Sequence, residues 1–450
     1  MHVRYLIIGA GPTGLGAGHR LKELGETSFL LLERNAYTGG LATSFKDSAG
    51  FTWDLGGHVV FSHYSYFDRL IEDLLGDQYL EHQRIAMVRM FERWVPYPFQ
   101  NNLRYLPKDV QWEIVEAMLP GRRPETHPSN FREWIDVIFG AGIAKYFMVP
   151  YNFKVWATPA EKMAYHWIGE RVSVVNLEMV LKNLILELDN RSWGPNNVFR
   201  FPLFGGTGDI FSRMGDRLGD FVRRNTEVVA VDPEARSVRT ADGETITYDH
   251  LLNTGPLDLF VLNSINTPNA DLRAAAASLA HNSVYVAGVG VDGMREDPTC
   301  WMYFPENNAP FYRVTNFHNY SPNNAAKPGA SRALMCETSY SAHKQEDLAS
   351  LMDATVQGLV NTALMNEKDR ENILSTWSYP IDYGYPVPTI DRDPSLRVLQ
   401  PWLESCRIYS RGRFGGWQYE AANMDHSVMQ GVEWADRMIE GKAETTYVVK

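Results

Sequence analysis

Residues 4–14 read RYLIIGAGPTG, an apolar run that leads directly into a G-x-G-x-x-G fingerprint. The run predicts a short, fully buried strand of a parallel sheet, and the LGAGHRLKELG pattern after it predicts a helix. In such a unit Gly9 allows the tight turn, Gly11 lets the backbone approach a pyrophosphate, and Gly14 lets helix and strand pack closely. The stretch therefore predicts a dinucleotide site in which the helix N-terminus faces the phosphates.

The next predicted strand ends in an acidic residue that is suitably placed for a ribose. The segment SFLLLE closes with Glu33, 24 residues after Gly9, close to the usual spacing for a ribose-binding acid. Arg34 follows, and the pair Gly39 and Gly40 comes shortly after it. That pair resembles the extended fingerprint of FAD-dependent oxidases, in which it gives the backbone a second approach to a long dinucleotide. We therefore predict FAD, bound without a covalent link, rather than NAD.

A second G-x-G-x-x-G occurs at residues 288–293, in a different context. It follows the strand-like SVYVAGV, but MREDP comes next, and Pro298 prevents a long helix from starting there. We therefore predict a strand and a turn at 288–293 rather than a second dinucleotide domain.

The composition is that of an ordinary globular protein. The 450 residues carry a formal net charge of −11, and 44% of them are hydrophobic. The acidic balance argues against a nucleic-acid partner, and no apolar run approaches the ~20 residues that span a membrane. Cys300, Cys336 and Cys406 lack metal-ligand spacing, so we expect no metal site and a reduced, cytoplasmic setting without a signal peptide.

The order of strand-like and helical segments predicts an α/β fold with three parts. A Rossmann-like FAD-binding domain of the amine-oxidase type takes residues 1–80, 205–281 and 385–450, because a strand pattern and a glycine-bearing loop return near the end of the chain. Helical periodicity assigns 108–190 to a helical substrate domain. Strand patterns assign 81–107, 191–204 and 282–384 to an antiparallel β-sheet domain.

Motifs along nearly the whole chain resemble those of UDP-galactopyranose mutases, most closely the eukaryotic, fungal type. They are GGHVVFSHY at 56–64, PYPFQNN at 96–102, YNFKVW at 151–156, GERV at 169–172, WMYFPE at 301–306, FYR at 311–313, YGYP at 383–386 and SRGRFG at 410–415. The chain is shorter than the fungal type around residues 322–332 and after the last predicted helix.

The resemblance implies an isomerase of cell wall biosynthesis that interconverts UDP-galactopyranose and UDP-galactofuranose with no net redox change. In that family reduced FAD attacks the anomeric carbon through N5 and forms a flavin–sugar adduct, UDP leaves, the sugar recloses as a furanose, and UDP returns. NADPH is the implied candidate reductant, at the positions of Arg84, Ala86 and Tyr97, although Ala86 lacks the expected hydroxyl. A homo-oligomer stays open.

Displacement of UDP develops negative charge on a diphosphate, which guanidinium groups bind well because they stay charged and form a fork. Arg171, Arg313 and Arg413 lie in aromatic or glycine-rich surroundings. The resemblance assigns Arg171 and Arg313 to the diphosphate, Arg413 to the flavin edge, and His58 to the flavin as a further catalytic residue. Because a histidine changes protonation near neutrality, His58 suits the stabilisation of a reduced flavin.

Aromatic walls and an amide side chain suit a uridine, and tyrosine hydroxyls suit phosphates and a sugar. The expected substrate residues, besides the two arginines, are Phe99, Gln100, Phe147, Tyr151, Asn152, Trp156, Asn197, Trp301, Tyr303, Tyr320, Tyr385 and Tyr419. The expected cofactor residues are Gly9, Gly11, Thr13, Gly14, Glu33, Arg34, Gly40, Leu41, Gly57, His58, Val228, Arg413, Asn423 and Met424. Segments 168–176 and 192–198 are expected to act as lids.

Three other functions stay open at this point. A flavin oxidase of the amine-oxidase or protoporphyrinogen-oxidase type accounts for the fingerprint and for Gly39 and Gly40, but not for the set of arginines and tyrosines. A mutase-like flavoenzyme that acts on another nucleotide sugar accounts for both. A non-catalytic flavin-binding partner protein has no use for the arginines.

Overall fold

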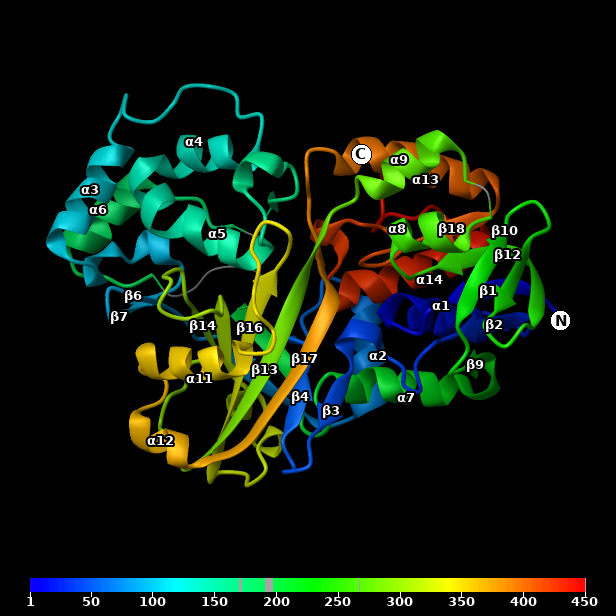
Figure 1. The fold of residues 1–450 in the computed structure, drawn as a ribbon, viewed down its shortest axis with the longest axis horizontal. Helices are drawn as coiled ribbons and strands as arrows, with labels where there is room; N and C mark the ends of the chain where they lie inside the picture. The colour runs from blue at the N-terminus through cyan, green and yellow to red at the C-terminus, as the bar shows by residue number, and fades with distance from the viewer. Residues whose placement is uncertain (170–171, 191–196, 267, 450) are drawn as a thin grey trace.

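The computed structural model of the protein describes residues 1–169, 172–190, 197–266 and 268–449. Two seven-stranded sheets and a group of helices form the fold (Figure 1). The first sheet lies at the right of the figure, the long strands of the second run through the middle, and the helical group lies at the left. Among the described residues, no helix is both long and apolar enough to cross a membrane.

The first sheet contains the predicted N-terminal strand at its centre. Its strands follow the order β10-β11-β12-β1-β2-β9, and β18 pairs with β12. Their bounds are β1 His2–Ile8, β2 Phe29–Leu32, β9 Val222–Arg223, β10 Val228–Asp232, β11 Ser237–Thr240, β12 Thr245–Asn253 and β18 Ile408–Ser410. β1 runs parallel to both β2 and β12. Most of its apolar residues are also buried, as expected for a continuous apolar strand that is covered on both faces.

Helices surround this sheet, and the first and last of them touch. The bounds are α1 Pro12–Glu23, α2 Ser65–Leu75, α7 Gly208–Leu218, α8 Leu257–Leu259, α9 Ala270–Ala277, α13 Arg392–Ser405 and α14 Met424–Glu440. A Cβ on Gly16 would lie 2.5 Å from the carbonyl oxygen of Val428, and one on Gly431 would lie 2.0 Å from that of Thr13. α1 and α14 therefore pack backbone against backbone, which only glycine permits.

The second sheet is long and mainly antiparallel, in the order β17-β13-β16-β15-β14-β6-β7. Its strands are β6 Ala86–Met90, β7 Arg93–Pro96, β13 His281–Asp292, β14 Trp301–Tyr303, β15 Arg313–Asn316, β16 Ser331–Tyr340 and β17 Ile373–Pro386, and the helices α10 Phe317–Tyr320, α11 Leu351–Asn361 and α12 Glu367–Glu371 accompany them. The strand predicted at 288–293 is confirmed, because Gly288 and Gly290 lie in β13. A Cβ at either position would meet the ring of Trp53 or Phe51 within 2.5 Å.

A group of helices lies within residues 108–190, and the domain boundaries predicted there stay a prediction. It consists of α3 Lys108–Met118, α4 Phe131–Ile143, α5 Val149–Trp156 and α6 Leu177–Ile185. Two small sheets, β3 Ser44–Lys46 with β4 Thr52–Asp54 and β5 Tyr79–Gln83 with β8 Val198–Pro202, complete the fold.

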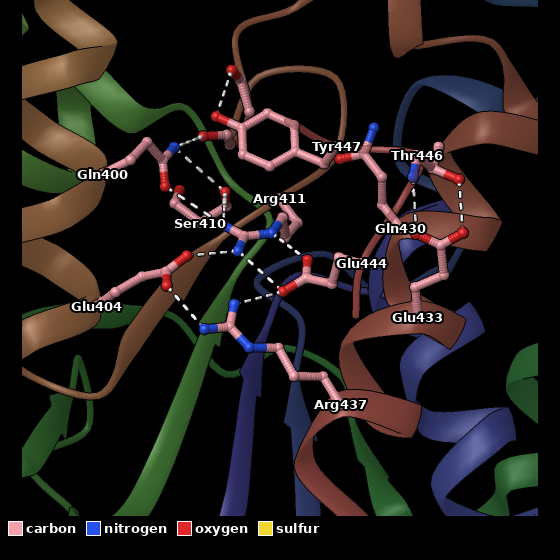
Figure 2. A network of polar contacts seen from close by, with 12 residues as sticks. Gln400, Glu404, Ser410, Arg411, Gln430, Glu433, Arg437, Glu444, Thr446 and Tyr447 are labelled. Carbon is pink, nitrogen blue, oxygen red and sulfur yellow. Dashed lines mark hydrogen bonds and ion pairs between the residues drawn. The ribbon is translucent and has the colours of Figure 1, made fainter. Parts of the chain in front are cut away.

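A polar network holds the C-terminal tail against the loop that follows β18 (Figure 2). Arg411, only 2% exposed, donates to Glu444 at 2.5 Å and pairs with Glu404 at 2.6 Å. Its guanidinium also lies over the ring of Tyr447, whose hydroxyl donates to the carbonyl of Gly416 at 3.1 Å. A buried guanidinium needs such compensation. The tail therefore fixes the loop from Arg411 to Gly416, which includes Arg413.

Candidate active site

Two glycine turns meet at the C-terminal end of β1. Gly9 has φ +96°, and a Cβ on Gly14 would lie 1.9 Å from the Gly9 carbonyl oxygen, so neither position accepts a side chain without strain. A Cβ on Gly40 would lie 3.2 Å from the Cα of Gly11, which places the two turns side by side. A Cβ on Gly11 itself meets nothing closer than 4.0 Å. Gly11 therefore keeps space open before the N-terminus of α1, as a pyrophosphate needs.

Glu33 lies beside this space, directly after β2. Its carboxylate is 6% exposed and accepts hydrogen bonds from the backbone N–H groups of Ala10 at 2.8 Å and of Asn35 at 2.9 Å. The Glu33 carbonyl accepts from the N–H of Thr226, two residues before Val228 at the start of β10. The structure thus brings Glu33, Val228 and the first glycine turn together, and their roles toward a cofactor stay predictions.

Gly56, Gly57 and His58 form a turn that contacts the second sheet. Gly56 has φ +135°, and a Cβ on Gly57 would lie 2.9 Å from Thr315 Oγ1 and 3.2 Å from Trp301 Nε1. The absence of side chains at both glycines therefore lets the backbone before His58 lie directly against β14 and β15.

The surroundings of His58 hold its imidazole neutral. Burial, which Glu337 opposes and Arg413 and Arg313 reinforce, lowers the pKa of His58 to about 4. The expectation that His58 changes protonation near neutrality is therefore wrong, because pattern and resemblance gave no measure of its burial. A neutral ring leaves one nitrogen to accept and one to donate.

A hydrogen-bonded aspartate joins the segment after His58 to the start of α14. The fully buried Asp425 accepts from Nδ1 of His63 at 2.8 Å and of His426 at 3.0 Å. Burial opposes ionisation of Asp425, yet the two imidazoles keep its pKa below the ordinary value. Asn423, the N-cap residue of α14, and Met424 are thereby fixed relative to the His58 turn.

Several buried polar atoms on expected site residues and on Thr315, which contacts the His58 turn, have no hydrogen-bond partner among the described residues. They are His58 Nδ1, Gln100 Oε1, Trp301 Nε1, Thr315 Oγ1 and Tyr320 Oη. Native interiors leave few such atoms, because each one costs about 1–3 kcal/mol unless a hydrogen bond is made. The set is rich in donors, so the chemistry of the residues present fits a polar ligand with acceptor atoms, as a flavin and a nucleotide both have.

Arg313 and Glu337 form a buried ion pair in the middle of the site. They are direct neighbours across β15 and β16. Arg313 donates through Nε and Nη2 to the two carboxylate oxygens, the second contact at 2.8 Å, and Glu337 is 2% exposed. The adjacent carboxylate raises the pKa of Arg313 although burial opposes this. The guanidinium is therefore fixed in direction and always charged.

Aromatic rings from α5 and from the segment after β7 form a continuous stack. Phe99 stacks on Phe147 with centroids 4.7 Å apart, and Phe147 stacks on Tyr151 at 5.2 Å. Tyr151 in turn meets the edge of Tyr303 at 5.5 Å. The Asn152 amide donates to the Met148 carbonyl at 2.7 Å. Phe99 and Phe147 are at most 3% exposed, so they support the stack from within the core.

A second aromatic group surrounds Arg413. Its guanidinium lies over the ring of Tyr385 at 4.9 Å and over that of Tyr419 at 5.8 Å. Trp156 meets Tyr419 at 4.8 Å and Tyr385 at 5.8 Å, both edge to face. The structure therefore brings Trp156, Tyr385, Tyr419 and Arg413, which are far apart in sequence, into one cluster.

Some predicted residues lie at the margin of the site or beyond what can be described. Arg171 and most of the lid segment 192–198 lie outside the described residues. The Asn197 carbonyl accepts from the N–H of Arg84 at 2.8 Å. The Arg84 guanidinium stands about equally far from the rings of Tyr97 and Trp301, at 6.0 and 5.8 Å. Tyr320 is fully buried among Phe199, Phe201 and other rings, away from solvent.

The sequence prediction missed two residues of this site, Glu337 and Tyr312. The Tyr312 hydroxyl lies 3.4 Å from the Glu337 carboxylate and 3.3 Å from the Tyr385 hydroxyl. One signal was available in the sequence, because Glu337 interrupts the apolar run ALMC and precedes TS in what becomes a buried strand. A carboxylate in such a strand needs a paired cation.

Comparisons with known proteins identify the family and the fold. The family model of flavin-containing amine oxidoreductases matches residues 12–439. A structure of reduced UDP-galactopyranose mutase is similar with a TM-score of 0.95 and 41% identity, over 99% of this chain and 96% of that one.

Two more distant structures share the fold. A proposed protoporphyrinogen oxidase from Exiguobacterium sp. 255-15 has a TM-score of 0.74 and 15% identity, over 98% of this chain and 99% of that one. Putrescine oxidase bound to putrescine has a TM-score of 0.66 and 16% identity, with the same coverage of both chains. Likeness at this level of identity concerns the fold alone.

Proposed function

The chain belongs to the UDP-galactopyranose mutase family within the flavin-containing amine oxidoreductases, and on that basis we propose that it interconverts UDP-galactopyranose and UDP-galactofuranose. One observation carries the proposal above all: 41% identity and a TM-score of 0.95 to reduced UDP-galactopyranose mutase over 99% of the chain. The reaction is an isomerisation and consumes no reductant in each turnover.

The residues present fit FAD, held without a covalent bond. Gly11 and Gly40 leave room for a pyrophosphate, Glu33 lies where a ribose would bind, and Arg413 with the N-terminus of α14 lies where the isoalloxazine would end. When bound and reduced, the flavin supplies the nucleophilic nitrogen that displaces UDP from the sugar. The neutral His58 offers that ring system a hydrogen bond through Nδ1, which has no partner within the described part of the chain.

The substrate end of the site is built for a nucleoside diphosphate. Arg313 offers N–H groups in a fixed direction to the diphosphate, whose negative charge grows as the glycosidic bond breaks. Tyr385 and Tyr419, which surround Arg413, provide hydroxyls for the phosphates and the sugar. The outer face of the stack that ends in Tyr151 supports a planar uracil.

The experiment that tests this function is an isomerisation assay with and without flavin reduction. The purified protein is incubated with UDP-galactofuranose, either oxidised or reduced with dithionite, and the nucleotide sugars are separated by chromatography. We expect UDP-galactopyranose only from the reduced protein. Formation of product by the fully oxidised protein, or oxygen consumption with an amine in place of isomerisation, would reject the proposal.

We also propose NADPH as the reductant, supported by the Arg84 guanidinium, which lies 6.0 Å from the ring of Tyr97 and 5.8 Å from that of Trp301. An arginine beside aromatic rings suits a phosphorylated nucleotide. Anaerobic stopped-flow mixing should bleach the flavin absorbance with NADPH faster than with NADH. Equal rates for both would remove Arg84 from that role.

A further inference from the structure

We propose that Glu337 is a positioning residue that sets the direction and the effective charge of Arg313 toward the leaving diphosphate. This inference rests on the proposed function, because it assigns the diphosphate to Arg313. It concerns a residue that neither the motifs nor the comparisons assign to the site.

Among the residues that the structure describes, Glu337 occupies one side of the Arg313 guanidinium. A guanidinium carries five N–H groups, and Glu337 takes two of them, one on Nε and one on Nη2. The remaining donors are the two on Nη1 and one on Nη2, which together form a fork on the far edge of the group. Because Glu337 is 2% exposed and lies directly across from Arg313 on the neighbouring strand, the fork cannot turn without breaking a buried ion pair.

Glu337 is also connected to Tyr385, a proposed substrate-binding residue, through the Tyr312 hydroxyl. The Tyr312 hydroxyl contacts the Glu337 carboxylate at 3.4 Å and the Tyr385 hydroxyl at 3.3 Å. Tyr312 is 2% exposed, so this chain of hydrogen bonds is shielded from water. One carboxylate therefore orients both Arg313 and Tyr385, which come from strands β15 and β17.

The backbone turn before His58 packs against the same carboxylate. A Cβ on Gly56 would lie 3.0 Å from Glu337 Oε1, so any residue larger than glycine there would press on it. The negative charge of Glu337 also raises the pKa of His58, against burial, Arg413 and Arg313. Glu337 thus contacts three parts of the site, none of which is adjacent to it in sequence.

The charge of Glu337 has a kinetic consequence. UDP must leave the sugar, stay nearby and then return, so an arginine that binds the free diphosphate too tightly would stabilise the separated state and slow the return. The Arg313–Glu337 pair has no net charge although the guanidinium stays charged, so the pair attracts free UDP less strongly than an isolated arginine would. The fork stays aimed at the position that the diphosphate occupies as the bond breaks. Glu337 therefore favours turnover over tight UDP binding.

The test is Glu337→Gln, examined by UDP titration and by turnover of the reduced protein. The amide is neutral and can accept from only one of the two N–H groups, so Arg313 loses its orientation and gains effective charge. We expect UDP to bind as tightly as to wild type or up to about tenfold tighter, and kcat to fall about ten- to hundredfold. A role in structure alone would instead weaken UDP binding along with flavin content.

A matched control and a double variant complete the experiment. Asp369→Asn removes a carboxylate paired with the buried Arg332 at 3.2 Å, outside the site, and should leave kcat and UDP binding unchanged. In an Arg313→Ala background Glu337→Gln should cause no further loss of kcat, because Glu337 acts through Arg313. An additional tenfold loss in that background, or wild-type kcat for the single variant, would overturn the inference.

Glu337→Asp keeps the inference testable if the glutamine variant does not fold. Aspartate retains the charge but cannot reach both N–H groups from the same backbone position, so kcat should fall while folding and flavin content persist. Wild-type kcat in that variant would count against a positioning role. If wild type itself does not isomerise UDP-galactofuranose, the proposed function fails; if wild type is active and Glu337→Gln is too, only this inference fails.

Discussion

The hydroxyl of Thr207, the N-cap residue of α7, donates a hydrogen bond of 2.8 Å to the carboxylate of Asp54 in β4. Asp54 is fully buried and also contacts the hydroxyl of Ser44. Despite these hydrogen bonds, burial raises the pKa of Asp54 to about 7. The carboxyl group thus carries a proton in the folded protein at pH values where it has lost it in the unfolded chain.

This relationship predicts that stability falls as pH rises from about 4 to 7. Between the two pKa values the folded state binds the extra proton, so raising the pH favours unfolding, by on the order of 4 kcal/mol in total. Asp54→Asn should remove this slope. Urea unfolding at pH 5 and pH 8 measures it, and Asp77→Asn, at an exposed position, serves as control. Parallel pH profiles for wild type and Asp54→Asn would contradict the assignment.

Lys154 should make stability depend on pH in the opposite direction to Asp54. It is 4% exposed, its ammonium group donates to the carbonyls of Glu306 and Ala309 at 2.9 Å each, and burial lowers its pKa to about 7. The unfolded chain binds more protons between pH 7 and about 10, so the contribution of Lys154 to stability rises over that range. The stability difference between wild type and Lys154→Met should therefore shift in favour of wild type from pH 7 to pH 9.5. Lys368→Met, at an exposed position, should show no such shift.

Substitutions at two fingerprint glycines should have different effects: one should abolish flavin binding, and the other should destabilise the fold. A methyl group on Gly11 meets nothing within 4.0 Å, whereas one on Gly14 would overlap the Gly9 carbonyl at 1.9 Å. Gly11→Val should fold yet purify colourless, because its side chain occupies the space for a pyrophosphate. Gly14→Ala should lose stability itself. Far-UV circular dichroism together with flavin absorbance distinguishes the two variants. A yellow Gly11→Val protein would contradict the assignment of the cofactor to this space.

Arg313→Ala should weaken UDP binding and also destabilise the fold. Loss of a charge-assisted contact, ~1.5–3 kcal/mol, corresponds to roughly ten- to hundredfold weaker binding. The substitution also leaves Glu337 buried without its cation, so thermal stability should drop, and Arg313→Ala with Glu337→Gln should recover part of it. Arg313→Lys should regain only some affinity, since it lacks the fork. Fluorescence titration with UDP and thermal unfolding measure the two effects. Unchanged UDP affinity in Arg313→Ala would reject the assignment of the diphosphate to Arg313.

Features that depend on neighbouring residues could be predicted from the sequence. The unit β1–turn–α1 follows from glycines and apolar residues within twenty positions. The strand through Gly288 follows from the strand-like SVYVAGV, since Pro298 excludes a long helix after it. The family and its α/β fold with a flavin site are confirmed by the comparisons. The domain boundaries and the individual site roles stay predictions.

What the sequence could not supply depends on contacts between distant segments. Arg313 was expected in the site, but its partner Glu337 becomes visible only when β15 and β16 are paired. The neutral state of His58 depends on burial and on Arg413, which lies more than three hundred residues away in the chain. Neither a motif nor a residue spacing measures burial, so the protonation of His58 was predicted wrongly.

The contact between α1 and α14 determines when the cofactor site can exist during synthesis. The ribosome releases the fingerprint first, but β1 gains its parallel neighbour β12 only after residue 253, and β18 and α14 emerge near the end. Until then the nascent chain exposes an unpaired edge of β12 and the uncovered face of α1, surfaces that favour chaperone binding and aggregation. Flavin capture therefore belongs to the last stage of biogenesis, after translation of α14.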